Sequence, residues 1–141
     1  MKVNIELVEG GKIPKKGHST DVGLDCFVRK VEIINNEIYK YYLGFKIEIP
    51  EGFGGFLFPR SSIKNFDLTL TNSVGVIDPY FSDEVTCFFK VTDINLTEPF
   101  VYELNHKCCQ LVILPLPSIE LEEVVSISEK NTRSGYGSTG L

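Results

Sequence analysis

Apolar and polar residues alternate along several stretches of this chain. In the segment FKIEIP, Phe45, Ile47 and Ile49 fall on one face of an extended backbone, and Lys46 and Glu48 fall on the other. The runs EVTCFFKVTDI and CCQLVILPLP are also β-rich. The second run is almost wholly apolar, which is typical of a strand in the middle of a sheet.

Helical periodicity is scarce, and turn residues are frequent. Seven prolines and the PEGFGG cluster divide the chain into short pieces. The segment NNEIYKYY predicts the tip of a hairpin that leads into a strand, and one short helix is expected near residues 62–66. We therefore predict an all-β fold, either a β barrel or a double-sheet jelly roll, with at most one short helix.

The length of 141 residues predicts a single domain with a real hydrophobic core. We expect residues 1–128 to form the β domain and residues 129–141, which include the glycine-rich stretch RSGYGSTGL, to form a flexible lid. A net charge of −5 gives no indication that the protein binds nucleic acid or a membrane surface. It leaves room for an anionic ligand that a few local cations would hold.

The cysteines and the N-terminus indicate a cytoplasmic protein, or a nuclear one in a eukaryotic host. The start MKVNIELVEG lacks the pattern of a signal peptide, and no apolar run approaches the roughly 20 residues that span a bilayer. The cysteines are Cys26, Cys87, Cys108 and Cys109. We expect reduced, buried thiols and no zinc site, and the adjacent Cys108 and Cys109 would point to opposite faces of a strand.

Asp78 is a candidate for a catalytic carboxylate. It follows Val76 and Ile77 in the segment GVIDPYFSDEV, and Pro79 ends the run. A carboxylate at the end of a buried strand is ionised at neutral pH and suits a general base that deprotonates a water. On this segment alone we favour the alternative, an aspartate that merely starts a turn before proline.

Two further segments carry groups that suit a nucleotide. In FPRSSIKNF, Arg60 offers a planar fork for phosphate oxygens, and Ser61 and Ser62 add hydroxyl donors; a solvated turn is the alternative. In LTLTNSVGVID, Asn72 presents a donor and an acceptor, and Gly75 allows close approach to the backbone. That segment is also consistent with a plain hairpin turn.

Two weaker signals lie in other strands. In STDVGLDCF, Asp25 and a second carboxylate near a glycine suit a hard cation bound through water, although a simple alternation of faces explains them equally. Gln110 precedes a buried run, so its amide needs partners, either in the core or on a ligand.

Taken in order, STDVGLDC, PRSSIKNF, NSVGVIDPYFSDEV, KCCQLVILP and RSGYGSTG resemble the five motifs of the trimeric deoxyuridine triphosphatases (dUTPases). The resemblance runs from about residue 18 to residue 140. It implies a β jelly roll assembled as a homotrimer with tail exchange and with active sites at subunit interfaces. It also implies Mg²⁺-dependent hydrolysis of dUTP to dUMP and pyrophosphate, which limits uracil in DNA and supplies dUMP for dTMP synthesis.

The resemblance assigns a role to each candidate residue. Asp78 matches the carboxylate that activates the attacking water, and Asp25 matches the aspartate near the water shell of the metal. The remaining matches are substrate-binding positions: Arg60, Ser61 and Ser62 for phosphates, Asn72, Gly75 and Ile77 for uracil, Gln110 for the phosphate region, and Arg133, Tyr136, Gly137, Ser138 and Thr139 in the tail.

Several positions depart from the family pattern, among them Ser82 and Asp83, which replace the usual Arg-Gly. Phe81 stands where the family usually has a tyrosine under the deoxyribose, so a flat ring is kept. Tyr136 replaces the usual phenylalanine that covers uracil. Arg133 lies three residues before that aromatic, whereas the usual arginine lies five before it, where this chain has Asn131.

Two other functions stay open on the sequence. The related dCTP deaminases share the fold and a similar RSS segment, but they need a glutamate at the position of Phe88. A regulatory protein of viral or phage type, which signals its nucleotide-bound state to a protein partner, would keep the same site.

Overall fold

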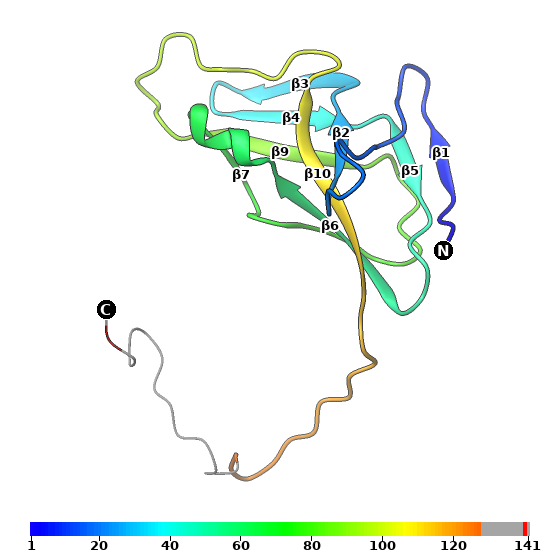
Figure 1. The fold of residues 1–141 in the computed structure, drawn as a ribbon. Helices are drawn as coiled ribbons and strands as arrows, with labels where there is room; N and C mark the ends of the chain where they lie inside the picture. Colours follow the sequence, from blue (N-terminus) through cyan, green and yellow to red (C-terminus); the bar gives the residue numbers. More distant parts are fainter. Residues whose placement is uncertain (128–139, 141) are drawn as a thin grey trace.

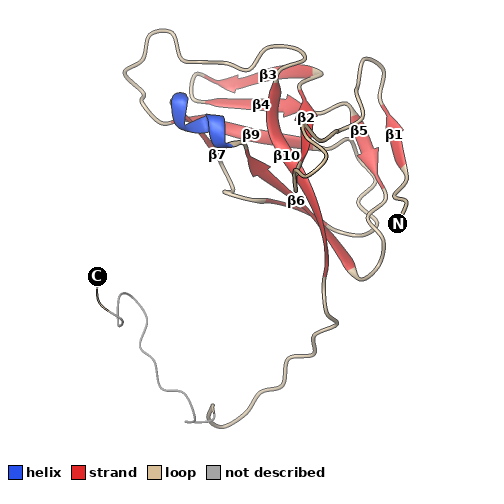
Figure 2. Cartoon of the chain, in the orientation of Figure 1, coloured by secondary structure: helices blue, strands red, loops and turns tan. Residues whose placement is uncertain are grey.

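A computed structural model describes residues 1–127 and residue 140 of the chain. Within these residues the protein is β-structure with one short 3₁₀ helix, as Figure 2 shows, and the all-β prediction is confirmed. The elements are β1 (Ile5–Leu7), β2 (Leu24–Phe27), β3 (Lys30–Asn35), β4 (Ile38–Tyr42), β5 (Phe45–Ile47), β6 (Phe53–Pro59), η1 (Ser61–Asn65), β7 (Leu68–Leu70), β8 (Gly75–Ile77), β9 (Thr86–Val91) and β10 (Lys107–Pro115).

The strands form two four-stranded sheets and a small two-stranded sheet. One large sheet has the order β2-β10-β6-β8, the other has the order β3-β4-β9-β7, and β1 pairs with β5. All the strand pairs are antiparallel. In Figure 1 the long β10 crosses the body of the molecule, and its place between β2 and β6 confirms that CCQLVILP is an interior strand.

Local signals in the sequence placed two of these elements correctly. The predicted hairpin joins β3 to β4, and the side chain of Asn35 accepts hydrogen bonds from the backbone N–H groups of Glu37 and Ile38. This local capping of the turn is what asparagine does well. The predicted short helix is η1, which begins one residue earlier than expected.

The core lies between the two large sheets and is rich in aromatic residues. Phe45, Ile47 and Ile49 are all buried, which confirms the alternation that predicted them. Tyr41 is fully buried, and its ring meets that of Phe89 edge to face with centroids 5.6 Å apart. Its hydroxyl accepts a hydrogen bond of 3.0 Å from the backbone N–H of Tyr102, so the polar atom is satisfied inside the core.

The expectation that Cys108 and Cys109 face opposite sides of their strand is wrong. Both side chains are fully buried, and their sulfur atoms lie 3.8 Å apart. The cause is an irregularity in the pairing of β10 with β2, where the register shifts between Lys107 and Cys109. A bulge of this kind interrupts strict alternation and turns two neighbouring residues to the same side. The prediction of buried, free cysteines is confirmed for all four.

After β10 the chain leaves the body of the protein. Leu116 donates its backbone N–H to Gly52, and the residues that follow run away from the sheets in Figure 1. This arm, residues 116–127, carries large apolar side chains that are mostly in solvent; Leu121 is 92% exposed and Val125 is fully exposed. Among the described residues no helix is long and apolar enough to cross a membrane.

A bidentate ion pair links the connection between β2 and β3 to the segment that precedes β9. Arg29 donates to Glu84 through Nε at 2.8 Å and through a terminal nitrogen at 2.7 Å, and the backbone N–H of Gly44 also donates to Glu84. Burial alone would raise the pKa of Glu84, but the hydrogen bonds from Arg29 and Gly44 outweigh it and hold this pKa below its ordinary value. The pair therefore stabilises the fold when Glu84 is ionised.

Replacing Glu84 with glutamine should lower the free energy of unfolding by about 2 kcal/mol at neutral pH, because a charge-assisted pair is lost and Arg29 keeps no counter-charge. The pKa of Glu84 is lowered on folding, so its contribution is complete above the unfolded pKa of about 4.3 and is lost as the pH falls further. Denaturant titrations at equal protein concentration from pH 7 to pH 3 should show that the gap in unfolding free energy between wild type and variant becomes smaller as the pH falls. The same change at the exposed Glu98 is the control, and an equal gap at pH 3 and pH 7 would contradict the assignment.

Candidate active site

Three strands bring the polar candidates of three separate segments together at one end of a sheet. Gln110 on β10 lies opposite Asp25 on one side and opposite Phe58 of β6 on the other. Arg60 directly follows β6. The register of β10 with its two neighbours therefore assembles Asp25, Gln110 and Arg60 from positions far apart in the sequence.

Asp25 is the electrostatic centre of this group. One of its oxygens accepts a hydrogen bond from Nε of Arg60 at 2.9 Å, and the other lies 3.0 Å from Nζ of Lys107. Its side chain is only 15% exposed, whereas those of Arg60 and Lys107 are about one third exposed. One partly buried carboxylate thus orients two cations whose outer surfaces stay open to an anionic ligand.

Lys107 was not among the residues predicted from the sequence. It directly precedes the apolar run that contains Gln110, and its backbone oxygen accepts a longer hydrogen bond of 3.4 Å from Arg60. A basic residue at the start of a buried strand is a weak signal alone. The pairing of β10 with β2 sets Lys107 opposite Phe27, and this brings the Lys107 side chain close to Asp25.

The side chain of Gln110 is held against the end of β6. Its amide nitrogen donates to the backbone oxygen of Pro59 at 3.1 Å, so the half-buried amide has a partner. Gly23 lies against this amide, and a Cβ at that position would collide with it. The glycine of the VGLD segment is therefore required by the close approach of Gln110.

The two serines that follow Arg60 differ in their surroundings. Ser61 is exposed at the start of η1. Ser62 is half-buried, and its hydroxyl oxygen is shielded from solvent with no hydrogen-bond partner among the described residues. A buried hydroxyl without a partner costs free energy, so a ligand or a neighbouring chain that supplies one would gain from it.

The segment with Asn72 and Asp78 is not a simple hairpin, which corrects that expectation. It connects β7 of one large sheet to β8 of the other, so it forms a corner between two sheets. The corner is tight: Ser73 has a positive φ of 62°, and its N–H donates to Leu70. Asn72 lies exposed at its tip, and Asp78 lies exposed just after the buried Ile77.

Asp78 and Arg60 lie at opposite ends of β6. The antiparallel pairing sets Gly75 opposite Leu57 and Ile77 opposite Gly55, so Asp78 follows next to Gly54, near the start of β6. Arg60 follows the end of the same strand. About six residues of extended chain separate the two positions by roughly 20 Å. One chain therefore does not bring the proposed base and the proposed phosphate clamp together.

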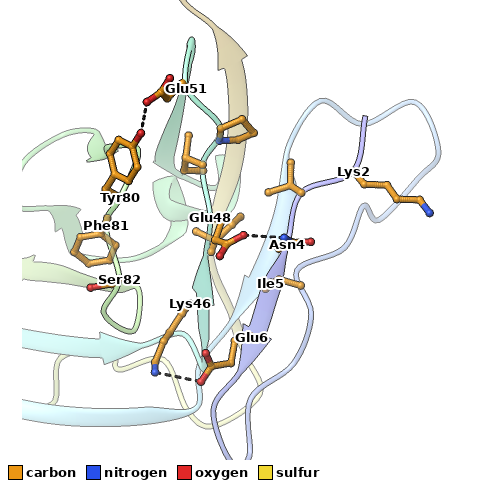
Figure 3. A pocket seen from close by; sticks show the side chains of 14 residues that line it. Lys2, Asn4, Ile5, Glu6, Lys46, Glu48, Glu51, Tyr80, Phe81 and Ser82 are labelled. Carbon is orange, nitrogen blue, oxygen red and sulfur yellow. Dashed lines mark hydrogen bonds and ion pairs between the residues drawn. The ribbon is translucent and has the colours of Figure 1, made fainter.

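A groove of about 650 Å³ borders the segment after Asp78. Figure 3 shows the rings of Tyr80 and Phe81 on one side and side chains of β1 and β5 on the other. Phe81 is 41% exposed, and the hydroxyl of Tyr80 donates to the carboxylate of Glu51. Tyr80 has a positive φ of 69°, an unusual conformation for a residue with a side chain. This bend sets the direction in which the Phe81 ring is presented.

The tail candidates lie outside the described residues. They are Arg133, Tyr136, Gly137, Ser138 and Thr139. Their roles stay predictions from the sequence.

Comparisons with known proteins agree on one family. The family described as dUTPase matches residues 9–140. The protein named deoxyuridine 5′-triphosphate nucleotidohydrolase from Clostridium tetani is 35% identical over 139 residues, covering 95% of this chain and 92% of its own length. The protein of the same name from Clostridium novyi is 32% identical, with both chains covered in full.

Solved structures show the same fold at lower identity. The dUTPase of Staphylococcus bacteriophage 80alpha, solved with the nucleotide analogue dUpNHpp, superposes with a TM-score of 0.80 at 24% identity and covers 99% of each chain. A dUTPase from phage phi11 of S. aureus, solved with a structural Mg(II) ion, gives a TM-score of 0.77 at 21% identity over 92% of this chain. With the family match over nearly its whole length and relatives above 30% identity, the chain belongs to the dUTPase family.

Proposed function

We propose that this dUTP diphosphatase hydrolyses dUTP to dUMP and pyrophosphate in sites that form only between the subunits of a homotrimer. The hydrolase class follows from the family. The observation that supports shared sites is the placement of Asp78 and Arg60 at opposite ends of β6. In a ring of identical subunits, Asp78 of one copy can meet the Arg60 group of the next.

The apolar arm supports an assembly of this kind. Residues 116–127 extend from the body, and a side chain as large as Leu121 is almost fully exposed. Apolar surface on an extended segment gains free energy when it packs against a neighbouring copy. An arm that leaves one subunit for the next matches the tail exchange that the family resemblance predicts.

The proposed chemistry divides between two groups of residues. Asp78 aligns a water and takes its proton as the water attacks the α-phosphorus. Arg60 and Ser61 hold the phosphates and stabilise the charge that develops on the leaving pyrophosphate. The hydroxyl of Ser62 and the amide of Gln110 complete the phosphate contacts.

The second group of residues recognises the base and the sugar. The amide of Asn72 and the main chain from Gly75 to Ile77 read the edge of uracil. The exposed ring of Phe81 supports the deoxyribose from below. A flat ring in this place leaves no room for a 2′-hydroxyl, so the enzyme should favour dUTP over UTP.

Mg²⁺ fits this site as an ion that arrives with the triphosphate. Both oxygens of Asp25 are engaged by cations of the chain, so Asp25 is placed to meet a metal only through its water shell. When bound, the ion would neutralise charge on the phosphate oxygens. Arg60 and Lys107 would add positive charge beside the phosphates from the protein side.

The last residues are proposed to close the site. Residues 129–141 would act as a lid over the nucleotide, separate from the β domain of residues 1–128. Tyr136 would stack on uracil, while Arg133, Ser138 and Thr139 would contact phosphates and the backbone of Gly137 would wrap around them. Closure excludes water other than the nucleophile.

The deaminase alternative is disfavoured by the residue where it needs a carboxylate. Phe88 lies on β9, is 37% exposed, and carries no group that could move a proton.

We propose that the enzyme acts in the cytoplasm, where it limits the incorporation of uracil into DNA.

Subunit complementation tests the shared site directly. Asp78→Asn and Arg60→Ala should each lower turnover by orders of magnitude, because each removes an essential group from all three sites. Refolding the two variants together in equal amounts should restore about one quarter of wild-type pyrophosphate release, the fraction of subunit pairs that unite both intact residues.

Size-exclusion chromatography must show the same oligomer for both variants and for their mixture. Recovery in the mixture would be impossible if both residues acted within one chain. A mixture no more active than the single variants would therefore overturn the shared site while leaving family membership untouched.

Asp25→Asn tests whether Asp25 positions the phosphate clamp. The variant loses the ion pairs to Arg60 and Lys107, so kcat/KM for dUTP should fall by about tenfold or more. Inhibition by dUMP should change much less, because dUMP lacks the two phosphates of the leaving group. The same substitution at the exposed Asp93 is the control, and equal losses for dUTP and dUMP would argue against a positioning role.

Removal of residues 133–141 tests the lid. Turnover of dUTP should fall by about a hundredfold or more, since the lid would complete the site and exclude water. The melting temperature and the oligomeric state should stay at their full-length values, because these residues lie beyond the β domain. A truncated enzyme with full turnover would exclude the lid.

A further inference from the structure

Three of the four cysteines meet between the two large sheets, at a place that the proposed hydrolysis of dUTP does not use. Cys87 comes from β9 of one large sheet, and Cys108 and Cys109 come from β10 of the other. The sulfur of Cys109 lies 3.8 Å from that of Cys108 and 4.0 Å from that of Cys87. The three sulfurs all lie within 4.8 Å of one another.

These distances suit a metal ion. With metal–sulfur bonds of about 2.3 Å, three sulfurs arranged trigonally around one ion lie about 4.0 Å apart. The distances of Cys109 to Cys108 and to Cys87 match this spacing, and the third distance is within 4.8 Å, so only small side-chain shifts would close the site. A disulfide would need the sulfurs about 2.05 Å apart, and all four cysteines are free.

The donor set and its surroundings indicate the class of ion. Within the described residues the group contains three thiols and no histidine or carboxylate. Cys26 is fully buried close by on β2 but lies outside the group of three. Soft thiolate ligands select soft ions, and three of them suit Cu(I), whereas structural Zn²⁺ takes four.

We propose that Cys87, Cys108 and Cys109 form a binding site for one soft, thiophilic metal ion, for which Cu(I) is the best fit. Binding replaces three S–H bonds with three metal–sulfur bonds and releases three protons to solvent, with no change of oxidation state. The bound ion would tie the two large sheets together at their centre. Because the site is closed to solvent, the ion would enter during folding or through slow opening of the barrel.

The test uses the full chain, refolded without oxygen in the presence of a reductant. One equivalent of Cu(I), buffered by a competing chelator, is supplied during refolding, and metal content is measured after gel filtration against the chelator. We expect one ion per chain, a raised melting temperature, and X-ray absorption that shows only sulfur neighbours. Activity toward dUTP, which does not use these thiols, reports correct folding.

Two alanine variants decide which sulfurs bind. Cys109→Ala removes the sulfur shared by both short distances, so affinity for Cu(I) should fall at least tenfold. Cys26→Ala is the matched control: it removes an equally buried thiol outside the group of three, and binding should persist. If Cys109→Ala does not fold, Cys87→Ala on the opposite sheet serves in its place and should show the same loss.

Three results would overturn the proposal. The first is retention of copper by Cys109→Ala at the wild-type level. The second is equal loss of copper in Cys26→Ala. The third is a correctly folded, active wild type that leaves gel filtration with no copper bound.

Discussion

The pairing of β10 with β6 is the interaction on which the rest of the structure depends. It joins seven residue pairs, from Cys109 opposite Pro59 to Pro115 opposite Phe53. At one end it brings Gln110 to the backbone of Pro59 and sets Arg60 beside Asp25. At the other end β10 runs out into the arm. One ladder of backbone hydrogen bonds thus fixes both the group around Asp25 and the place where the chain leaves its two sheets.

Much of this could be predicted from the sequence, because strands and turns leave local patterns. Alternation identified the buried face of β5, and Asn35 marked a turn. The order of five short motifs indicated the family, since their residue types and spacing are specific when taken together. These signals depend only on residues that are close in sequence, so they can be recognised in a single sequence.

Other features depend on register and on contacts between distant strands. Lys107 reaches Asp25 only because β10 pairs with β2, and no local sequence pattern indicates which strands pair. The bulge that turns Cys108 and Cys109 to one side breaks the alternation on which the opposite expectation rested. The corner at Asn72 resembles a hairpin in sequence, yet its two strands belong to different sheets.

In the proposed homotrimer, the exposed arm would leave each chain vulnerable to misassembly before the subunits associate. An extended segment with large apolar side chains in water is open to strand addition by any unfolded or foreign polypeptide. Correct association must therefore be faster than misassembly. A higher chain concentration speeds both processes, so slow synthesis or dilution prolongs the vulnerable stage, and the yield of native protein becomes a competition between rates as well as a matter of stability.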